Sequence, residues 1–253
     1  LVDFSNQLVD YEPDGVLIYA GHNEYYGALG VASSSLLANN PRMVEMMLSF
    51  RNLKLIQAIT RLANSFNSQK SPSPNQDLTL MERMAAHHQI PYQSALYKAG
   101  VEQFNYNIGN ILQRLNNLNI PVFIGTLASS LKGQKPLCKD TVDSLYNAAR
   151  EYGLGELSYA QSSYKEAQQH YFRAKEYDAL RFRAPDVFNK IIRSYCELFK
   201  NVHLVDVEGK LAANSQNGIL GNELMLEHVH PNLAGQRLIA DACLDALISN
   251  FSK

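Results

Sequence analysis

The 253-residue chain has no tryptophan and only three cysteines, which lie far apart in the sequence at Cys138, Cys196 and Cys243. They form no C-x-x-C pair, so neither a zinc site nor a disulfide framework is indicated. Long apolar runs are also missing, because no window approaches the roughly eighteen uncharged apolar residues that a membrane helix needs. The sequence therefore predicts no membrane segment.

An excess of either charge is missing as well, since the formal net charge at pH 7 is −1. No basic surface argues for nucleic acid as a partner, and no polybasic segment argues for anionic lipid. Hydrophobic residues make up 46% of the chain and charged residues 19%, which is the composition of a globular protein with a substantial core. The length suits one large domain, or a domain with insertions.

The chain does not begin with methionine, and its first residues already follow a helical pattern. The apolar residues that share one face at helical spacing are Leu1, Phe4, Leu8 and Tyr11. This pattern indicates the end of an amphipathic helix, so we expect the sequence to come from the middle of a longer protein.

An uncharged apolar run, Val16 to Ala20, stops at Gly21 and is followed by polar residues. A short apolar run bounded by turn residues is typical of a strand buried on both faces of a parallel sheet. The polar residues then lie at the carboxyl end of the strand, where open α/β sheets bind ligands. Gly21 allows a sharp turn and Asn23 offers an amide donor to a ligand, although an ordinary exit from strand to loop is the alternative.

The rest of the chain alternates amphipathic helical stretches with short apolar runs, which is typical of βαβ units and predicts an α/β fold with a parallel sheet. Asp206, near the end of the third strand, is expected to cap the turn that follows rather than to reach the site. Further strands are expected at residues 120–127 and 202–207, and helices at residues 42–63, 78–88, 94–117, 185–199 and 233–251.

Residues 140–183 differ in composition and resemble one tetratricopeptide repeat, with small residues where two helices cross and aromatic residues between them. One such repeat cannot bury its own apolar face, and several are normally stacked. We therefore expect a helical hairpin that is inserted in the α/β domain and packs on it. The matching residues are Leu154, Gly155, Tyr164, Ala167, Tyr171 and Ala174.

The strongest chemical signal is the segment Glu227-His228-Val229-His230-Pro231-Asn232. Glu227 lies three residues before His230, so its carboxylate can hold the imidazole in one tautomer while the other ring nitrogen faces a substrate. Pro231 fixes the backbone as it enters the last helix. In an alternative reading, His228 and His230 are two ligands of a metal ion, but no other group at ligand spacing completes such a site. A helix-capping loop without chemistry is the simplest alternative.

Taken together, Gly21-His22-Asn23-Glu24 and Glu227–Asn232 resemble the third block (Gly-x-Asn-Asp) and the fifth block (Asp-x-x-His) of the SGNH, or GDSL-type, hydrolase family. The resemblance implies a three-layer α/β/α fold of flavodoxin-like type, with a five-stranded parallel sheet. It implies that Asn23 donates to the oxyanion, that His230 is the general base and that Glu227 orients it. Gly21, His22 and Glu24 would form the rim of the site, and no cofactor or metal is implied.

The sequence departs from the family pattern in two respects. Glutamate stands at 24 and 227 where the family has aspartate, and the Gly-Asp-Ser block that carries the nucleophile is absent. The serines at 33, 34, 129 and 130 do not lie in its place. In the family's strand order 2-1-3-4-5, the three strands found here would be the last three. We therefore expect residues 1–253 to form a partial domain, without its amino-terminal strands and its nucleophile, and to be inactive alone.

The resemblance thus implies the carboxyl-terminal part of a serine esterase that acts on a small-molecule, carbohydrate or lipid acyl ester. An acyltransferase that uses the same site is an alternative, because an alcohol can replace water as acceptor. The second alternative is a non-catalytic binding or scaffold protein on a degenerate hydrolase fold. In that case the hairpin would contact a protein partner. The resemblance also suggests an extracytoplasmic bacterial location.

Overall fold

Three short strands form one parallel sheet at the centre of the molecule. The computed structural model describes residues 2–27, 30–32, 89–138 and 145–251. The strands are β1 (Val16–Ile18), β2 (Val122–Gly125) and β3 (Val202–Val205), in the order β1-β2-β3. Val16 pairs with Val122, and Val122 pairs with Val202. The predicted α/β class with a parallel sheet is confirmed.

The helices match most of the sequence-based expectation. The helices predicted at 42–63 and 78–88, and the serines at 33 and 34, lie outside the described residues. No helix among the described residues is long and apolar enough to cross a membrane. The helices are α1 (Val2–Leu8), α5 (Ala95–Asn117), α6 (Ala148–Ala160), α7 (Tyr164–Tyr177), α8 (Asp186–Leu198), α9 (Val207–Ala213) and α10 (Leu233–Phe251), with short 3-10 turns η1 (Val9–Tyr11) and η2 (Gln216–Gly218).

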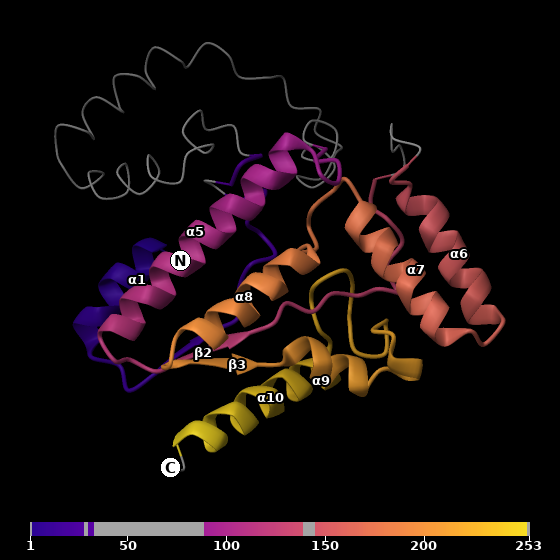
Figure 1. Cartoon of the computed structure of the whole chain (residues 1–253). Coiled ribbons are helices and arrows are strands. Elements are labelled where there is room, and N and C mark those ends of the chain that lie inside the picture. Colours follow the sequence, from indigo (N-terminus) through magenta and orange to yellow (C-terminus); the bar gives the residue numbers. More distant parts are fainter. Residues whose placement is uncertain (1, 28–29, 33–88, 139–144, 252–253) are drawn as a thin grey trace, which may run out of the picture.

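Helices cover both faces of the sheet (Figure 1). On one face, α5 and α8 meet through the rings of Phe104 and Phe188, which stack with centroids 3.9 Å apart. Val122 and Ile124 of the central strand point into this core. On the other face, Phe123 packs with residues of α9 and α10. This alternation is the period of two that a buried strand requires.

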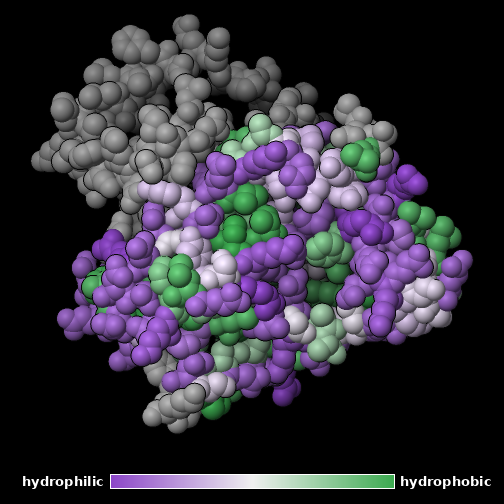
Figure 2. All heavy atoms as spheres, viewed as in Figure 1, coloured by the Kyte–Doolittle hydropathy of each residue, from purple (hydrophilic) through white to green (hydrophobic). Residues whose placement is uncertain are grey.

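The surface in Figure 2, seen in the same view, is mainly hydrophilic and is interrupted by hydrophobic side chains. This is the expected consequence of amphipathic helices, which turn their apolar stripe to the sheet and leave the polar face to solvent. Within α5, a helix of 23 residues, Ser94 caps the first turn by accepting a hydrogen bond from the Tyr97 N–H at 3.1 Å.

The predicted helical hairpin is formed by α6 and α7. At its crossing point, a Cβ atom on Gly155 would lie only 2.8 Å from Cδ1 of Tyr171, so this position has room for glycine alone. Ala167 and Tyr171 are fully buried. The small and aromatic positions of the repeat-like pattern therefore make the helix contact. The likeness to a tetratricopeptide repeat and the boundaries 140–183 remain predictions.

Five buried charged residues lie in the last turn of α7 and in the loop that connects α7 to α8. At their centre is an ion pair between Asp178 and Arg183, which are 1% and 3% exposed and whose atoms Oδ2 and Nη2 lie 3.0 Å apart. Asp178 also accepts hydrogen bonds from the backbone N–H groups of Leu137, Cys138 and Leu180. The pair thus fixes the loop after β2 to the end of the hairpin. The five residues are Lys175, Glu176, Asp178, Arg181 and Arg183.

We expect Asp178→Ala to lower the free energy of unfolding by about 3–5 kcal/mol, because it leaves the Arg183 guanidinium buried without its counter-charge. Urea unfolding measures this. The double variant Asp178→Ala/Arg183→Met should lose clearly less than the sum of the two single variants, since it leaves no buried charge unpaired. Additive losses would contradict the role given to the pair.

Candidate functional site

The two polar segments singled out in the sequence line one cleft of about 910 Å³. Residues 19–24 supply one wall, where the chain leaves β1, and residues 228–231 supply the other, just before α10. The segments are about two hundred residues apart in the sequence, yet all six predicted site positions except Glu227 line this cleft. Glu227 contacts two of the residues that do.

Gly21 allows the chain that follows β1 to lie close to the side chains of Leu127 and Phe104. A Cβ atom at this position would lie 2.5 Å from Cδ1 of Leu127 and 3.3 Å from Phe104, so any larger residue would push the turn away from α5 and from the loop after β2. The tight packing sets the direction in which the next residues enter the cleft.

Asn23 and Glu24 follow in a turn that is closed by a hydrogen bond of 2.7 Å from the Gly27 N–H to the Asn23 carbonyl. Asn23 is exposed, and no hydrogen bond within the described residues engages its side-chain amide. Glu24 instead accepts a hydrogen bond of 2.8 Å from the Asn107 amide on α5, and burial raises the pKa of its carboxyl group. Asn23 is therefore the donor that this turn presents to a ligand.

His22 anchors the same turn to the segment before α8. Its Nδ1 accepts a hydrogen bond of 3.1 Å from the Ala184 N–H, so the ring proton resides on Nε2. Nε2 is buried without a hydrogen bond of good geometry, although it lies close to the Ala128 backbone. Burial first, and then the charge of Lys175, lower the pKa of His22 to about 4. At neutral pH the ring is therefore uncharged, and its hydrogen bond with Ala184 holds the turn against the segment before α8.

His230 and Glu227 adopt the relation that the sequence predicts. Glu227 Oε1 contacts Nδ1 of His230 and accepts a hydrogen bond of 2.8 Å from the His230 N–H. The imidazole side chain is 74% exposed, and its Nε2 is left free of the carboxylate. An imidazole that a carboxylate holds in this way can act as a general base.

Glu227 also contacts His228, which the sequence presented only as a candidate metal ligand. Its second oxygen, Oε2, contacts Nδ1 of His228. His228 is 8% exposed, and burial, followed by the charge of Arg183, lowers its pKa to about 4. Its carbonyl accepts a hydrogen bond of 2.9 Å from the Ser130 N–H. No sequence signal separates this buried histidine from the exposed one two residues later.

The backbone around His230 is pinned before α10 begins. The Leu226 N–H donates to the His230 carbonyl at 2.8 Å, within an antiparallel bridge between Met225 and Pro231. The Asn232 side chain then caps the helix by accepting a hydrogen bond of 3.0 Å from the Gly235 N–H. The loop is therefore a helix cap as well as a carrier of His230.

No serine, threonine or cysteine is among the described residues that line the cleft. Ser130 is fully buried, and its carbonyl accepts a hydrogen bond from Arg183. Ser129 lines a different cavity. Asp206 caps α9 through the Gly209 N–H at 3.3 Å, as expected, and does not line the cleft. Within the described part of the chain, no group of three or more potential ligands is placed to hold a metal ion.

Comparison of the chain with protein-family models, with curated proteins and with solved structures finds no match.

The two buried histidines predict a stability that falls in mild acid. Their pKa values of about 4 lie below the value of 6.5 for an unperturbed histidine, so the unfolded chain binds more protons between these limits and stability falls as the pH drops. Between pH 7.5 and 5, the loss should be about 2 kcal/mol for each histidine, measured by urea unfolding.

The variant His228→Gln should lose about half of this pH dependence, because glutamine does not titrate. His230→Gln removes an exposed neighbouring ring and is the matched control, which should keep most of the dependence. An unchanged slope in His228→Gln would contradict a buried, neutral His228.

Proposed function

We propose that this chain supplies the general base and one oxyanion donor of a serine-type ester hydrolase of SGNH type. The observation that carries the proposal is the cleft itself, where Asn23 and the His230–Glu227 pair meet from opposite ends of the chain. Neither segment alone is specific. Their convergence on one side of the sheet, at the carboxyl end of β1, supports a shared role.

In the proposed reaction, Nε2 of His230 takes the proton of a serine hydroxyl as that oxygen attacks the ester carbonyl. Glu227 keeps the Nδ1 proton in place and stabilises the imidazolium that forms. The amide of Asn23 donates a hydrogen bond to the oxyanion of the tetrahedral intermediate. His230 then passes its proton to the leaving alcohol, and the cycle repeats with water as the nucleophile.

The proposal requires a serine hydroxyl from outside the described residues that line the cleft. It assigns β1, β2 and β3 to the last three strands of the family order 2-1-3-4-5. Among the described residues no strand pairs with the outer edge of β1, which supports this assignment. Leu17 is 52% exposed in β1, and a groove of about 420 Å³ runs between β1, α1 and α5. In this assignment, the strand that precedes the nucleophile pairs along this edge.

The walls of the cleft favour an acyl ester with an apolar part. Phe182, Val229 and Ile239 line the cleft beside the polar residues. The cleft is wide and open, which suits an ester of a carbohydrate or lipid as well as a small synthetic ester. Cofactors play no part in the proposed chemistry.

The test is hydrolysis of p-nitrophenyl butyrate by the protein as it is expressed from its natural gene. His230→Ala should reduce kcat by at least about 10³-fold, since the base is lost, and Asn23→Ala by about 10²–10³-fold with little change in KM. His203→Gln is the matched control, because this histidine lies on β3 beside Phe123 and does not line the cleft.

Labelling with a fluorophosphonate probe, followed by mass spectrometry, identifies the attacking serine. The proposal expects one labelled serine outside the cleft-lining residues described above, and loss of labelling in His230→Ala. Full activity in His230→Ala would exclude the proposed base. An intact protein that neither hydrolyses esters nor takes the label would instead be a binding or scaffold protein on a degenerate hydrolase fold.

A further inference from the structure

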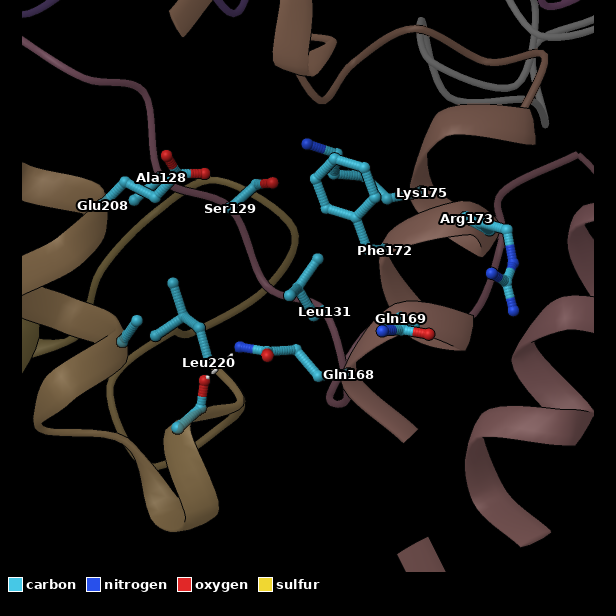
Figure 3. A pocket seen from close by; sticks show the side chains of 12 residues that line it. Ala128, Ser129, Leu131, Gln168, Gln169, Phe172, Arg173, Lys175, Glu208 and Leu220 are labelled. Atoms are coloured by element: carbon cyan, nitrogen blue, oxygen red, sulfur yellow. Dashed lines mark hydrogen bonds between the residues drawn. The ribbon is translucent and has the colours of Figure 1, made fainter. Parts of the chain in front are cut away.

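A second cavity, of about 340 Å³, shares no lining residue with the cleft. Its walls come from the loop after β2, from the hairpin helix α7, and from α9 with the turn that follows it (Figure 3). It therefore lies where the hairpin packs against the α/β part of the molecule. Neither the hydrolase proposal nor the sequence patterns give it a role.

The polar groups of this cavity gather at one end. Figure 3 shows the side-chain ends of Glu208, Ser129 and Lys175 in the same region of the cavity. Lys175 is 6% exposed, and its Nζ lies 3.1 Å from the Glu176 carboxylate, which leaves other N–H donors of the ammonium group for a ligand. No hydrogen bond within the described residues engages the Ser129 hydroxyl.

Glu208 brings the opposite charge to the same end. Among the described residues, the Glu208 carboxylate forms an ion pair with Arg193 on α8, at 4.0 Å. Arg193 lies closer to Asp206, at 2.7 Å. Burial raises the pKa of Glu208, and the charge of Lys175 opposes this rise. The Glu208 side chain is 38% exposed and also forms a hydrogen bond with Asn189, but no described cation pairs with it more closely than 4.0 Å, so its carboxylate can accept a cationic group placed in the cavity.

The opposite end of the cavity is apolar. Leu131 and Leu220 form its walls, and Gln168 closes one side through a hydrogen bond of 2.9 Å from its amide to the Gly218 carbonyl. The Phe172 ring lies nearer the polar end, with its centroid 4.9 Å from Nζ of Lys175 (Figure 3). Arg173 points away in Figure 3 and pairs with Glu151 at 2.7 Å. The cationic group that faces the ligand space is therefore that of Lys175.

We propose that this cavity binds a free α-amino acid with an aliphatic side chain. The α-carboxylate accepts hydrogen bonds from Lys175 and Ser129, and the α-ammonium group donates to Glu208. The aliphatic side chain fills the apolar end. A simple carboxylate would meet the negative charge of Glu208, and a simple amine the positive charge of Lys175, so adjacent opposite charges select a zwitterion.

Isothermal titration calorimetry with L-leucine tests the proposal, with 4-methylpentanoate and 3-methylbutylamine as probes that each lack one charged group. Leucine should bind, and each probe should bind at least about tenfold more weakly, because one charge-assisted set of hydrogen bonds is lost. Absence of heat with leucine at millimolar concentration, or equal binding of either probe, would overturn the proposal.

Two variants locate the binding. Glu208→Gln removes the partner of the ammonium group, and Ala212→Phe fills the apolar end of the cavity. Both should weaken leucine binding at least about tenfold, at an unchanged melting temperature. Glu197→Gln, an exposed carboxylate on α8, is the matched control and should bind leucine normally. His230→Ala should also bind it normally, which separates this site from the hydrolase cleft. Normal binding in Glu208→Gln would overturn the assignment.

Discussion

The buried ion pair between Asp178 and Arg183 is the interaction on which the rest of this molecule depends. Two charges in a nearly water-free position are stable only when their remaining hydrogen-bonding groups also find partners. Here the backbone N–H groups of three residues donate to Asp178 and the Ser130 carbonyl accepts from Arg183, so that Nε of Arg183 is the one buried side-chain atom of the pair left without a partner among the described residues. The pair therefore dictates where the loop after β2, the end of the hairpin and the start of α8 must meet.

The candidate cleft is built on this junction. The segment that follows Asp178 contacts both motifs: the Ala184 N–H holds His22, and the ring of Phe182 packs against that of His228. The nearby cations Lys175 and Arg183 help to keep these two histidines neutral. Of the three histidines at the cleft, His230 alone is both exposed and oriented by a carboxylate. The junction thus separates two structural rings from one that is free to act.

Much of the fold could be predicted because its signals are local. The strands at β1, β2 and β3, the long helix α5 and the final helix α10 all follow from runs and spacings of apolar residues. The strand-end rule predicted polar site residues such as Asn23 after β1, whereas the expectation that Asn23 and His230 share a site came from the resemblance to the SGNH family; both residues line one cleft. The helix α9 escaped prediction, because it is short and contains a glycine, Gly209.

The contacts that depend on the folded chain could not be read from the sequence. Nothing local distinguishes Asp178 and Arg183 from solvated charges on a helix end. The sharing of Glu227 between His228 and His230, and the cavity beside Ser129 and Lys175, arise from packing between distant segments. The spacing of Glu227 and His230, three residues apart, did predict the contact between these two side chains, but not the contact of Glu227 with His228.

The most direct measurement for the central claim is the tautomer of each cleft histidine, from long-range ¹H–¹⁵N correlation spectra at pH 8. The account predicts that His230 carries its proton on Nδ1, facing Glu227, while His22 carries it on Nε2 because its Nδ1 accepts from Ala184. In Glu227→Ala, His230 should revert to a mixture dominated by the Nε2 tautomer. A wild-type His230 that already has its proton on Nε2 would contradict its assignment as an oriented general base.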